Sequence, residues 1–511
     1  MIVASSSVAG KTDRLLNLAQ NLSAFVRQCV QQGTSFDDFE RGTLGQILQM
    51  GSAAAELFLL AQGNGDLGET VTTENGAILE RSDTPLSRPL RSIFGEHRFH
   101  SFVYSQGPNQ KIELRPIDAR LNLPEGKASY LFEEFSQLFC VEKAFGVGAE
   151  QLQAVFQQTV SVNALEHINR TMGTQAELFL EQMPKPLAKT EGELLIITAD
   201  GKGVPLVRAE AQQVPVFEEK LERPGNRRMA TLGCVYTVDP YVRTPEQIVA
   251  ALFRDEKVQQ PDDRPEPVGK HYRGCFAEPA QPDQPAIPSA YGTFAWIVQE
   301  ARTRHRAGQP VIRLMDGQLS LWETADVCME EWIAELHETE ACLVVDILDI
   351  LHVSSYLWRA AKVLYGAKEH REAFVQDRML RILQGDVRGV VTGMRRMTSQ
   401  RDLKGKDLKE MNTACNYLEK NAERMRYDEY LRAGYPIASG VIEGACRHVI
   451  KDRMEQGGMR WTLRGAQAML NVRSVCASSE WKIFHQWRQA EGAKRLHQHR
   501  ALVANYQGFT A

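Results

Sequence analysis

Three apolar runs of strand length end at or near an aspartate, and this pattern constrains the fold most strongly. The runs are LIITADGKG with Asp200, VIRLMDGQL with Asp316, and CLVVDILDILH with Asp349 and His352 near its end. Continuous runs of Val, Ile and Leu are typical of strands buried on both faces. Because helical patterns separate the runs, residues 191–366 predict an α/β sheet in which carboxylates at neighbouring strand ends cluster.

Two interpretations of these carboxylates follow from the residues alone. Asp-Gly after an apolar run is a strong signal for a hairpin turn, so Asp200 or Asp316 taken singly can belong to a turn. A cluster of carboxylate oxygens is instead what Mg²⁺ requires. Two such ions about 4 Å apart can activate an attacking hydroxyl and stabilise a leaving oxygen in phosphoryl transfer.

A fourth carboxylate lies in GYPIASGVIEGACRHVIKDRMEQGGMRW, residues 434–461. Ser439 is expected to cap a helix that ends at the two consecutive glycines. Glu443 lies one turn before Arg447 and two turns before Lys451, so one helix edge carries a carboxylate followed by two cations. Both a surface ion-pair ladder and a metal ligand followed by phosphate-binding cations fit this spacing.

The segments before residue 191 predict a different organisation. Residues 126–173 read as three helices, with the first join at Gly146 and Gly148 and with Ser161 capping the last helix. The last two resemble a helix-turn-helix with Asn163 and His167 exposed on its second helix, although an ordinary helical hairpin has the same pattern. The predicted segments are a helical region (1–75), a small strand-rich element (76–125), a helix-turn-helix-like domain with a linker (126–190), a first core part (191–366) with a surface excursion (255–290), a helical insertion (367–430), a final core part (431–478) and a basic C-terminal tail (479–511).

Composition narrows the class of protein. A chain of 511 residues with 43% hydrophobic and 24% charged residues indicates a soluble protein of several domains. No uncharged apolar stretch has the length of a membrane span, so we expect a cytoplasmic protein without a membrane partner. The nine cysteines form no Cys-x-x-Cys pair, which favours reduced thiols. VAGKT at residues 8–12 lacks the first glycine of a phosphate loop, so no nucleotide cofactor is expected.

The net charge of −4 leaves only local surfaces for a polyanion. Residues 441–511 form one, with 11 Lys and Arg against 5 Asp and Glu. We expect His497 and His499 on its solvated or DNA-facing side.

The blocks TADGKGVP, LMDGQLSLW, DILHVSSYLWRAA and residues 434–461 together resemble the signature blocks of bacterial insertion-sequence transposases of the Kra type, relatives of the Mutator superfamily. The resemblance implies a ribonuclease H-like core, a mixed sheet flanked by helices with a helical insertion. It also implies an Asp-Asp-Glu triad of Asp200, Asp316 and Glu443 that holds two Mg²⁺ ions, or Mn²⁺. Asp349 and His352 match an Asp-x-x-His element of the Mutator relatives, as a support or as the alternative second ligand.

The activity that this resemblance implies is DNA transposition: binding of the element's ends, metal-dependent strand cleavage and strand transfer. Its partners would be double-stranded DNA of the ends and the target, with a homodimer or higher homo-oligomer on DNA in the bacterial cytoplasm. A catalytically silent DNA-binding protein and a nuclease that cuts without joining are the alternatives. The residues expected to bind DNA are Arg447, Lys451, Arg453, Arg460, Arg464, Asn163 and His167.

Overall fold

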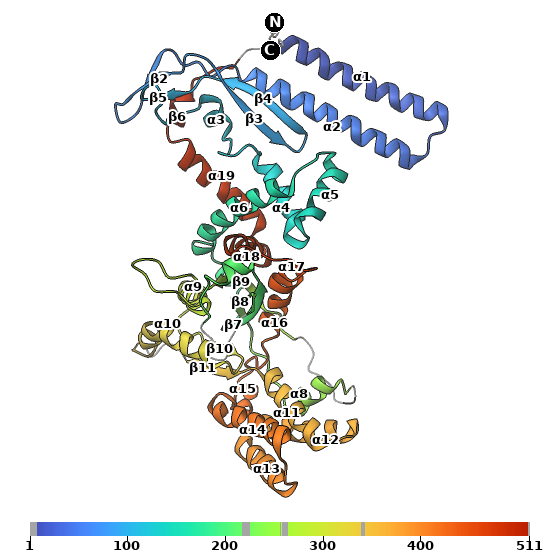
Figure 1. Cartoon of the computed structure of the whole chain (residues 1–511), viewed down its shortest axis with the longest axis vertical. Helices are drawn as coiled ribbons and strands as arrows, with labels where there is room; N and C mark the ends of the chain where they lie inside the picture. Colours follow the sequence, from blue (N-terminus) through green and yellow to red (C-terminus); the bar gives the residue numbers. More distant parts are fainter. Residues whose placement is uncertain (1–7, 217–224, 256, 258–263, 339–342, 509–511) are drawn as a thin grey trace. The chain divides into compact units, whose positions relative to one another are not determined.

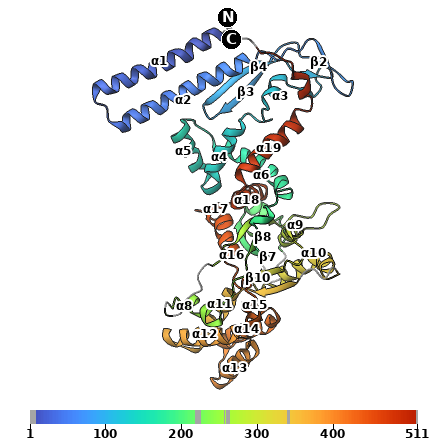
Figure 2. The same cartoon turned by 180° about the vertical axis from the view of Figure 1, so that it is seen from behind.

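The structure is a computed structural model that describes residues 8–216, 225–255, 257, 264–338 and 343–508 (Figures 1 and 2). The chain divides into two compact units. Unit 1 comprises Met1–Thr171 and Trp481–Ala511, and unit 2 comprises Met172–Glu480. The fold is mixed α/β, with both parallel and antiparallel strand pairs. Every cysteine within the described residues is a free thiol, and Cys342 lies outside them.

Unit 1 begins with a hairpin of two long helices, α1 (Val8–Gln32) and α2 (Phe36–Ala61). The Ser35 side chain caps α2 by accepting from the Asp38 backbone N–H. The helices pack closely where the ring of Phe25 lies over Gly42, since a Cβ at residue 42 would meet that ring at 2.5 Å. By length and composition alone, α2 is the one helix within the described residues that could span a membrane.

The predicted strand-rich element contains two small antiparallel sheets. One has the strand order β1-β2-β5-β6, and the other is the hairpin β3-β4. Buried Leu79, Tyr104 and Leu114 form the core of the first sheet. The strand bounds are β1 (Thr70–Thr72), β2 (Ile78–Arg81), β3 (Leu86–Ser92), β4 (Gly95–Ser101), β5 (Tyr104–Ser105) and β6 (Ile112–Leu114).

The helices expected between residues 126 and 173 are present, but the first join was predicted at the wrong place. Gly146 and Gly148 lie inside α5. A glycine at residue 148 lets this helix approach Cys140, because a Cβ at residue 148 would lie 2.6 Å from the Cys140 Sγ. Ser161 Oγ accepts from the Ala164 backbone N–H at the start of α6, as predicted. The helices are α3 (Pro116–Leu121), α4 (Tyr130–Glu142), α5 (Phe145–Phe156) and α6 (Val162–Glu181).

The C-terminal segment is not a solvated tail. It forms α19 (Trp481–Leu496) and a short 3₁₀ helix, η4 (Arg500–Val503), and belongs to unit 1. Arg488 of α19 donates to Glu133 of α4 at 2.6 Å in a buried ion pair. His497, expected at the surface, is buried and donates through Nε2 to the Leu123 carbonyl at 2.9 Å. Local basic composition predicted exposure here, and these tertiary partners override it.

Unit 2 contains a five-stranded sheet with the order β11-β10-β7-β8-β9. β8 is antiparallel to β7 and β9, whereas β10 is parallel to β7 and β11. The predicted surface excursion at 255–290 is wrong for residues 268–276, which form the edge strand β9. The bounds are β7 (Leu194–Pro205), β8 (Arg227–Val238), β9 (Val268–Phe276), β10 (Val311–Met315) and β11 (Val344–Leu348).

β7 does not end at Asp200. Asp200 pairs with Leu232, and the pairing with β8 continues to Pro205, so Asp200-Gly201 is not a hairpin turn. What changes at Asp200 is burial: the strand is buried from Leu194 to Ala199 and half-exposed from Asp200 to Gly203. The carboxylate therefore marks where the strand leaves the core.

Helices cover both faces of this sheet (Figures 1 and 2). α9 (Ser289–Arg304) and α10 (Leu319–Glu338) lie on one side. Ile297 of α9 packs closely over Gly233, since a Cβ at residue 233 would lie 2.6 Å from the Ile297 Cδ1. On the other side Leu470 packs over Gly274 in the same way. That side carries α16 (Gly440–Ala445), the π-helix η3 (Cys446–Lys451), α17 (Asp452–Met454) and α18 (Leu463–Ala477).

The segment predicted as a helical insertion is helical. The elements around it are α8 (Pro245–Phe253), α11 (Ile350–Leu364), α12 (Lys368–Leu383), α13 (Val387–Gln400), α14 (Gly405–Lys420), η2 (Ala422–Arg424) and α15 (Tyr427–Arg432). Two further short helices are η1 (Ala188–Thr190) and α7 (Arg208–Ala211).

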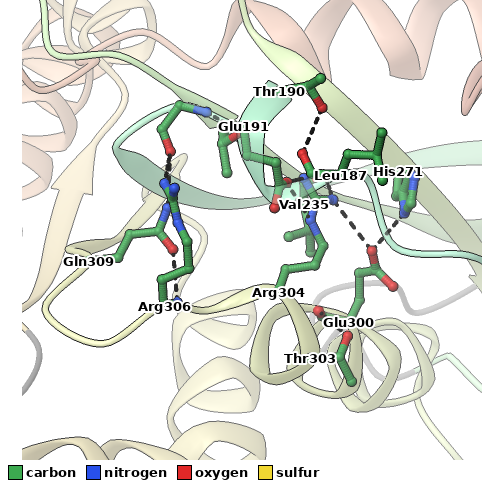
Figure 3. Close-up of polar contacts among 12 residues, drawn as sticks. Leu187, Thr190, Glu191, Val235, His271, Glu300, Thr303, Arg304, Arg306 and Gln309 are labelled. Atoms are coloured by element: carbon green, nitrogen blue, oxygen red, sulfur yellow. Dashed lines mark hydrogen bonds and ion pairs between the residues drawn. The ribbon is translucent and has the colours of Figure 1, made fainter.

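A buried charge network ties the helix α9 to the sheet (Figure 3). Arg304 donates to Glu191 at 3.0 Å, to Glu300 at 3.3 Å and to the Val235 carbonyl at 3.2 Å. His271 of β9 contacts the same Glu300 oxygen through Nδ1 at 2.6 Å. Because every member has a partner, the network fixes β8, β9 and α9 without leaving an isolated buried charge.

Candidate functional site

Strand register brings the three predicted aspartates into one row. Arg313 of β10 pairs with Ile197 of β7, and the same register continued by three residues sets Asp316 beside Asp200. Met315 pairs with Leu348 of β11, so the next residues, Asp316 and Asp349, are also neighbours. Adjacent strands lie about 4.8 Å apart, so the three carboxylates share one edge of the sheet.

Glu443 reaches this edge from α16, which is held in place by the end of β11. The Ser439 backbone N–H and hydroxyl donate to Asp349 at 3.2 and 2.9 Å, immediately before α16 begins. On the other side Cys446 Sγ lies 3.8 Å from the Asp200 carbonyl oxygen. The helix that carries Glu443 is therefore fixed between β7 and β11. The prediction that Ser439 caps this helix with its side chain is wrong, because Asp349 takes its hydroxyl.

His352 lies among three of the carboxylates. Its Nδ1 is 2.9 Å from Asp349 Oδ2 and 3.8 Å from Glu443 Oε1, and its Nε2 is 4.0 Å from Asp316 Oδ2. One ligand atom each from Asp349, His352 and Glu443 lie within 4.8 Å of one another. These three atoms lie close enough together to hold a cation when the His352 ring is neutral.

The electrostatics of the site reflect crowded negative charge. Burial raises the pKa of Asp316, and the nearby charges of Asp200 and Asp349 raise it further. Burial also raises the pKa of Glu443, with the charge of Asp349 next and that of Asp200 also contributing. The hydrogen bond to Asp349 raises the pKa of His352 to about 9, so at neutral pH the ring is an imidazolium surrounded by carboxylates.

The two candidates for the second ligand have different environments. Asp349 is fully buried, and its oxygens accept from Leu351, His352 and Ser439. Asp316 is part-exposed, and one of its oxygens accepts from the Gln318 backbone N–H at 3.0 Å. Asp349 therefore anchors the surrounding chain, while the other Asp316 oxygen, Oδ2, lies 4.0 Å from His352 Nε2.

The residues predicted to bind DNA separate into three groups. Asn163 and His167 are exposed on α6 within unit 1. In unit 2, exposed side chains occur at Arg447, Lys451, Arg460 and Arg464. The prediction for Arg453 is wrong: it is fully buried, and its guanidinium carbon lies 4.9 Å from the centre of the Trp461 ring.

Two residues beside Asp316 were not predicted from the sequence. Trp322 Nε1 donates to the Asp316 carbonyl at 2.6 Å, and the ring of Tyr417 lies against Gly317, in the space that a Cβ there would occupy. Tyr417 comes from α14, so the helical insertion touches the loop that carries Asp316. The signal in the sequence was the glycine after Asp316, which indicates close approach of another segment as well as a turn.

Comparisons with known proteins give no family. A scan against protein-family models finds no match, and a search of the curated proteins finds none. Among solved structures, a chain of the Drosophila P element transposase strand transfer complex matches with 9% sequence identity and a TM-score of 0.22, over 72% of this chain and 82% of that one. A TM-score this low does not establish a common fold.

Proposed function

We propose that this chain is a DNA transposase with a ribonuclease H-like core, in which Asp200, Asp316 and Glu443 hold two divalent metal ions. The observation that supports the proposal is the parallel pairing of β7 with β10 up to Ile197 and Arg313, three residues before Asp200 and Asp316, together with the docking of the Glu443 helix at the same edge. Numbered along the chain, the sheet has the order 3-2-1-4-5, with the first carboxylate on strand 1 and the second after strand 4. This arrangement supports the core that the resemblance implied.

The donor set fits hard divalent cations. Carboxylate oxygens are the ligands that Mg²⁺ and Mn²⁺ prefer. Burial raises the pKa values of Asp316 and Glu443, and the charges of Asp349 and Asp200 raise both further. Bound there, two ions would activate an attacking hydroxyl and stabilise the leaving oxygen. Asp349 would act as a positioning residue, because it fixes both His352 and the start of the Glu443 helix.

Four exposed cations follow Glu443 along the chain and are candidates for binding the DNA backbone: Arg447, Lys451, Arg460 and Arg464. Removing one cation that binds a phosphate should lower the slope of log affinity against log salt by about 1. Arg453 is left out of this surface because it is buried. Asn163 and His167 would contact the element's ends if the helix-turn-helix interpretation holds.

The test is a strand-transfer assay in Mg²⁺ with a linear DNA that carries both ends of the element encoding the chain. We expect Asp200→Asn, Asp316→Asn and Glu443→Gln to abolish cleavage and joining while binding to the DNA ends persists. Glu323→Gln, an exposed carboxylate near Asp316 in sequence, is the matched control and should stay active.

The outcomes separate the three candidate functions. Cleavage without joined products would indicate a nuclease, and binding without cleavage by the wild-type chain would indicate a DNA-binding protein. Cleavage that survives in Asp316→Asn but is lost in a folded Asp349→Asn variant would transfer the second metal ligand to Asp349.

A further inference from the structure

The α1–α2 hairpin carries a mostly exposed apolar surface, over which the Phe94 ring of unit 1 lies at Gly51. Along α1 it follows the spacing three, four, three, four, which is the repeat of helices that pack side by side. The same repeat runs along α2, except that one step of three residues is replaced by a step of four residues. The stripe positions, mostly exposed, are Ala9, Thr12, Leu16, Ala19, Ser23, Val26 and Val30 on α1, and Phe36, Glu40, Leu44, Ile47, Gly51, Ala54 and Phe58 on α2.

These two stripes are distinct from the contact between the helices. That contact uses the ring stacking of Phe25 on Phe39 and the buried side chains of Cys29 and Ala53. Each stripe follows these inner positions by one residue, a rotation of about 100° around the helix. Because α1 and α2 run in opposite directions, the two rotations turn both stripes to the same side of the hairpin.

The size of this face fits a copy of itself. Helices of 25 and 26 residues are each about 38 Å long, so stripes about 10 Å wide give roughly 760 Å² per copy, close to the ~800 Å² per partner of a standard interface. The charged side chains that flank the stripes are largely paired within the hairpin, Lys11 and Arg14 with Glu56 and Arg41 with Asp37.

We propose that the hairpin is a dimerisation element, in which α1 of one copy packs on α2 of a second copy to form an antiparallel four-helix bundle. A two-fold arrangement uses the same patch on both copies, so that the stripe of each α1 meets the α2 stripe of the other copy. Phe94, whose ring lies over Gly51, extends the apolar face at its border. This inference does not depend on the proposed function, since it uses no residue of the carboxylate site.

Sedimentation equilibrium of the full chain, without metal or DNA and between about 0.5 and 50 µM, tests the proposal. Val30 on the stripe is 76% exposed and Val327 on α10 is 66% exposed, so Val30→Glu and Val327→Glu make the same chemical change at comparable exposure. We expect the wild type and Val327→Glu to be dimers. Val30→Glu and Ile47→Glu should each raise the dimer dissociation constant by about a hundredfold or more, because every dimer would bury two unpaired carboxylates.

Circular dichroism at each variant's concentration shows whether the helices persist, so loss of the dimer is distinguishable from unfolding. A wild-type chain that is monomeric at about 50 µM overturns the proposal, as does a dimer that survives both Val30→Glu and Ile47→Glu. Flotation with vesicles of phosphatidylcholine and phosphatidylglycerol gives the remaining outcome. A monomeric wild type that binds vesicles through Val30 would assign the face to a membrane and also overturn the proposal.

Discussion

Binding of Mn²⁺ to the carboxylate site should release a proton from His352. The His352 imidazolium contacts Asp349 and lies near Asp316 and Glu443, so it occupies the position of a counterion. A divalent cation on the same carboxylates weakens these interactions and repels the ring's positive charge. The pKa of His352 should then fall from about 9 toward or below its ordinary value of 6.5.

The number of protons follows from these two pKa values. At pH 7.5 a group of pKa about 9 is about 97% protonated and a group of pKa 6.5 about 9% protonated, so binding should release about 0.9 proton. The sign is that metal affinity rises with pH, by about sevenfold per unit between about pH 7 and 8.5, and levels off above about pH 9.

Titration calorimetry in two buffers of different ionisation enthalpy measures this number directly. The buffer-dependent part of the enthalpy, divided by the difference in ionisation enthalpy, gives the protons released. His352→Gln is the control, because the amide can donate to Asp349 but does not titrate, so its proton release should fall to near zero. If Mn²⁺ binds with the same enthalpy in both buffers, His352 is not an imidazolium before binding. If Mn²⁺ does not bind, the proposed metal centre is refuted.

Three further outcomes follow from the geometry. Asp349→Ala should lower the free energy of unfolding of unit 2 by about 2–4 kcal/mol, because it removes the acceptor for buried donors at two helix starts, whereas Asp316→Asn should leave the melting temperature within a few degrees. Arg453→Ala should lower the melting temperature without changing the salt dependence of DNA affinity, whereas Arg447→Ala should lower the salt slope by about 1 at unchanged stability. Gly173→Ala should destabilise unit 2 by about 2–4 kcal/mol, because its Cβ would overlap the backbone of α18 at Ala468. A thermal melt of each variant beside the wild type checks the stabilities, and DNA titrations at several salt concentrations check the slopes.

The carboxylate row could be predicted because the local sequence shows where the apolar run of each strand ends. Apolar runs that stop being apolar at Asp200 and at Asp316 show where each strand leaves the core. A supporting role for Asp349 was predicted, but its contact with Ser439 was not, because Ser439 lies 90 residues away and nothing local reveals that contact. The edge strand β9 was missed for a related reason. Its polar residues His271 and Arg273 suggest a surface segment, yet His271 contacts buried Glu300 on α9 and Arg273 donates to the Glu177 carbonyl on α6.

Arg453 shows that the helical repeat and the charge of a side chain can predict opposite burial at one position. It stands three residues after Ile450 and four after Val449, both buried, so the helical repeat placed it on the inner face. Its charge favoured the surface, and the prediction followed the charge. The Trp461 ring accepts the guanidinium at close range, which is how an arginine can occupy a core position.

The helical insertion is part of the site's support. Tyr427 and Tyr430 of α15 donate through their hydroxyls to the carbonyls of Leu348 and Asp346 on β11, at 2.7 and 2.9 Å. Tyr417 of α14 packs against the residue that follows Asp316. The insertion thus holds β11 and the Asp316 loop, and the chain that leaves it leads within a few residues to Ser439 and Glu443. All three contacts are made to the backbone and none to a carboxylate. Docking of the insertion therefore sets the spacing of the carboxylates without the help of a bound cation.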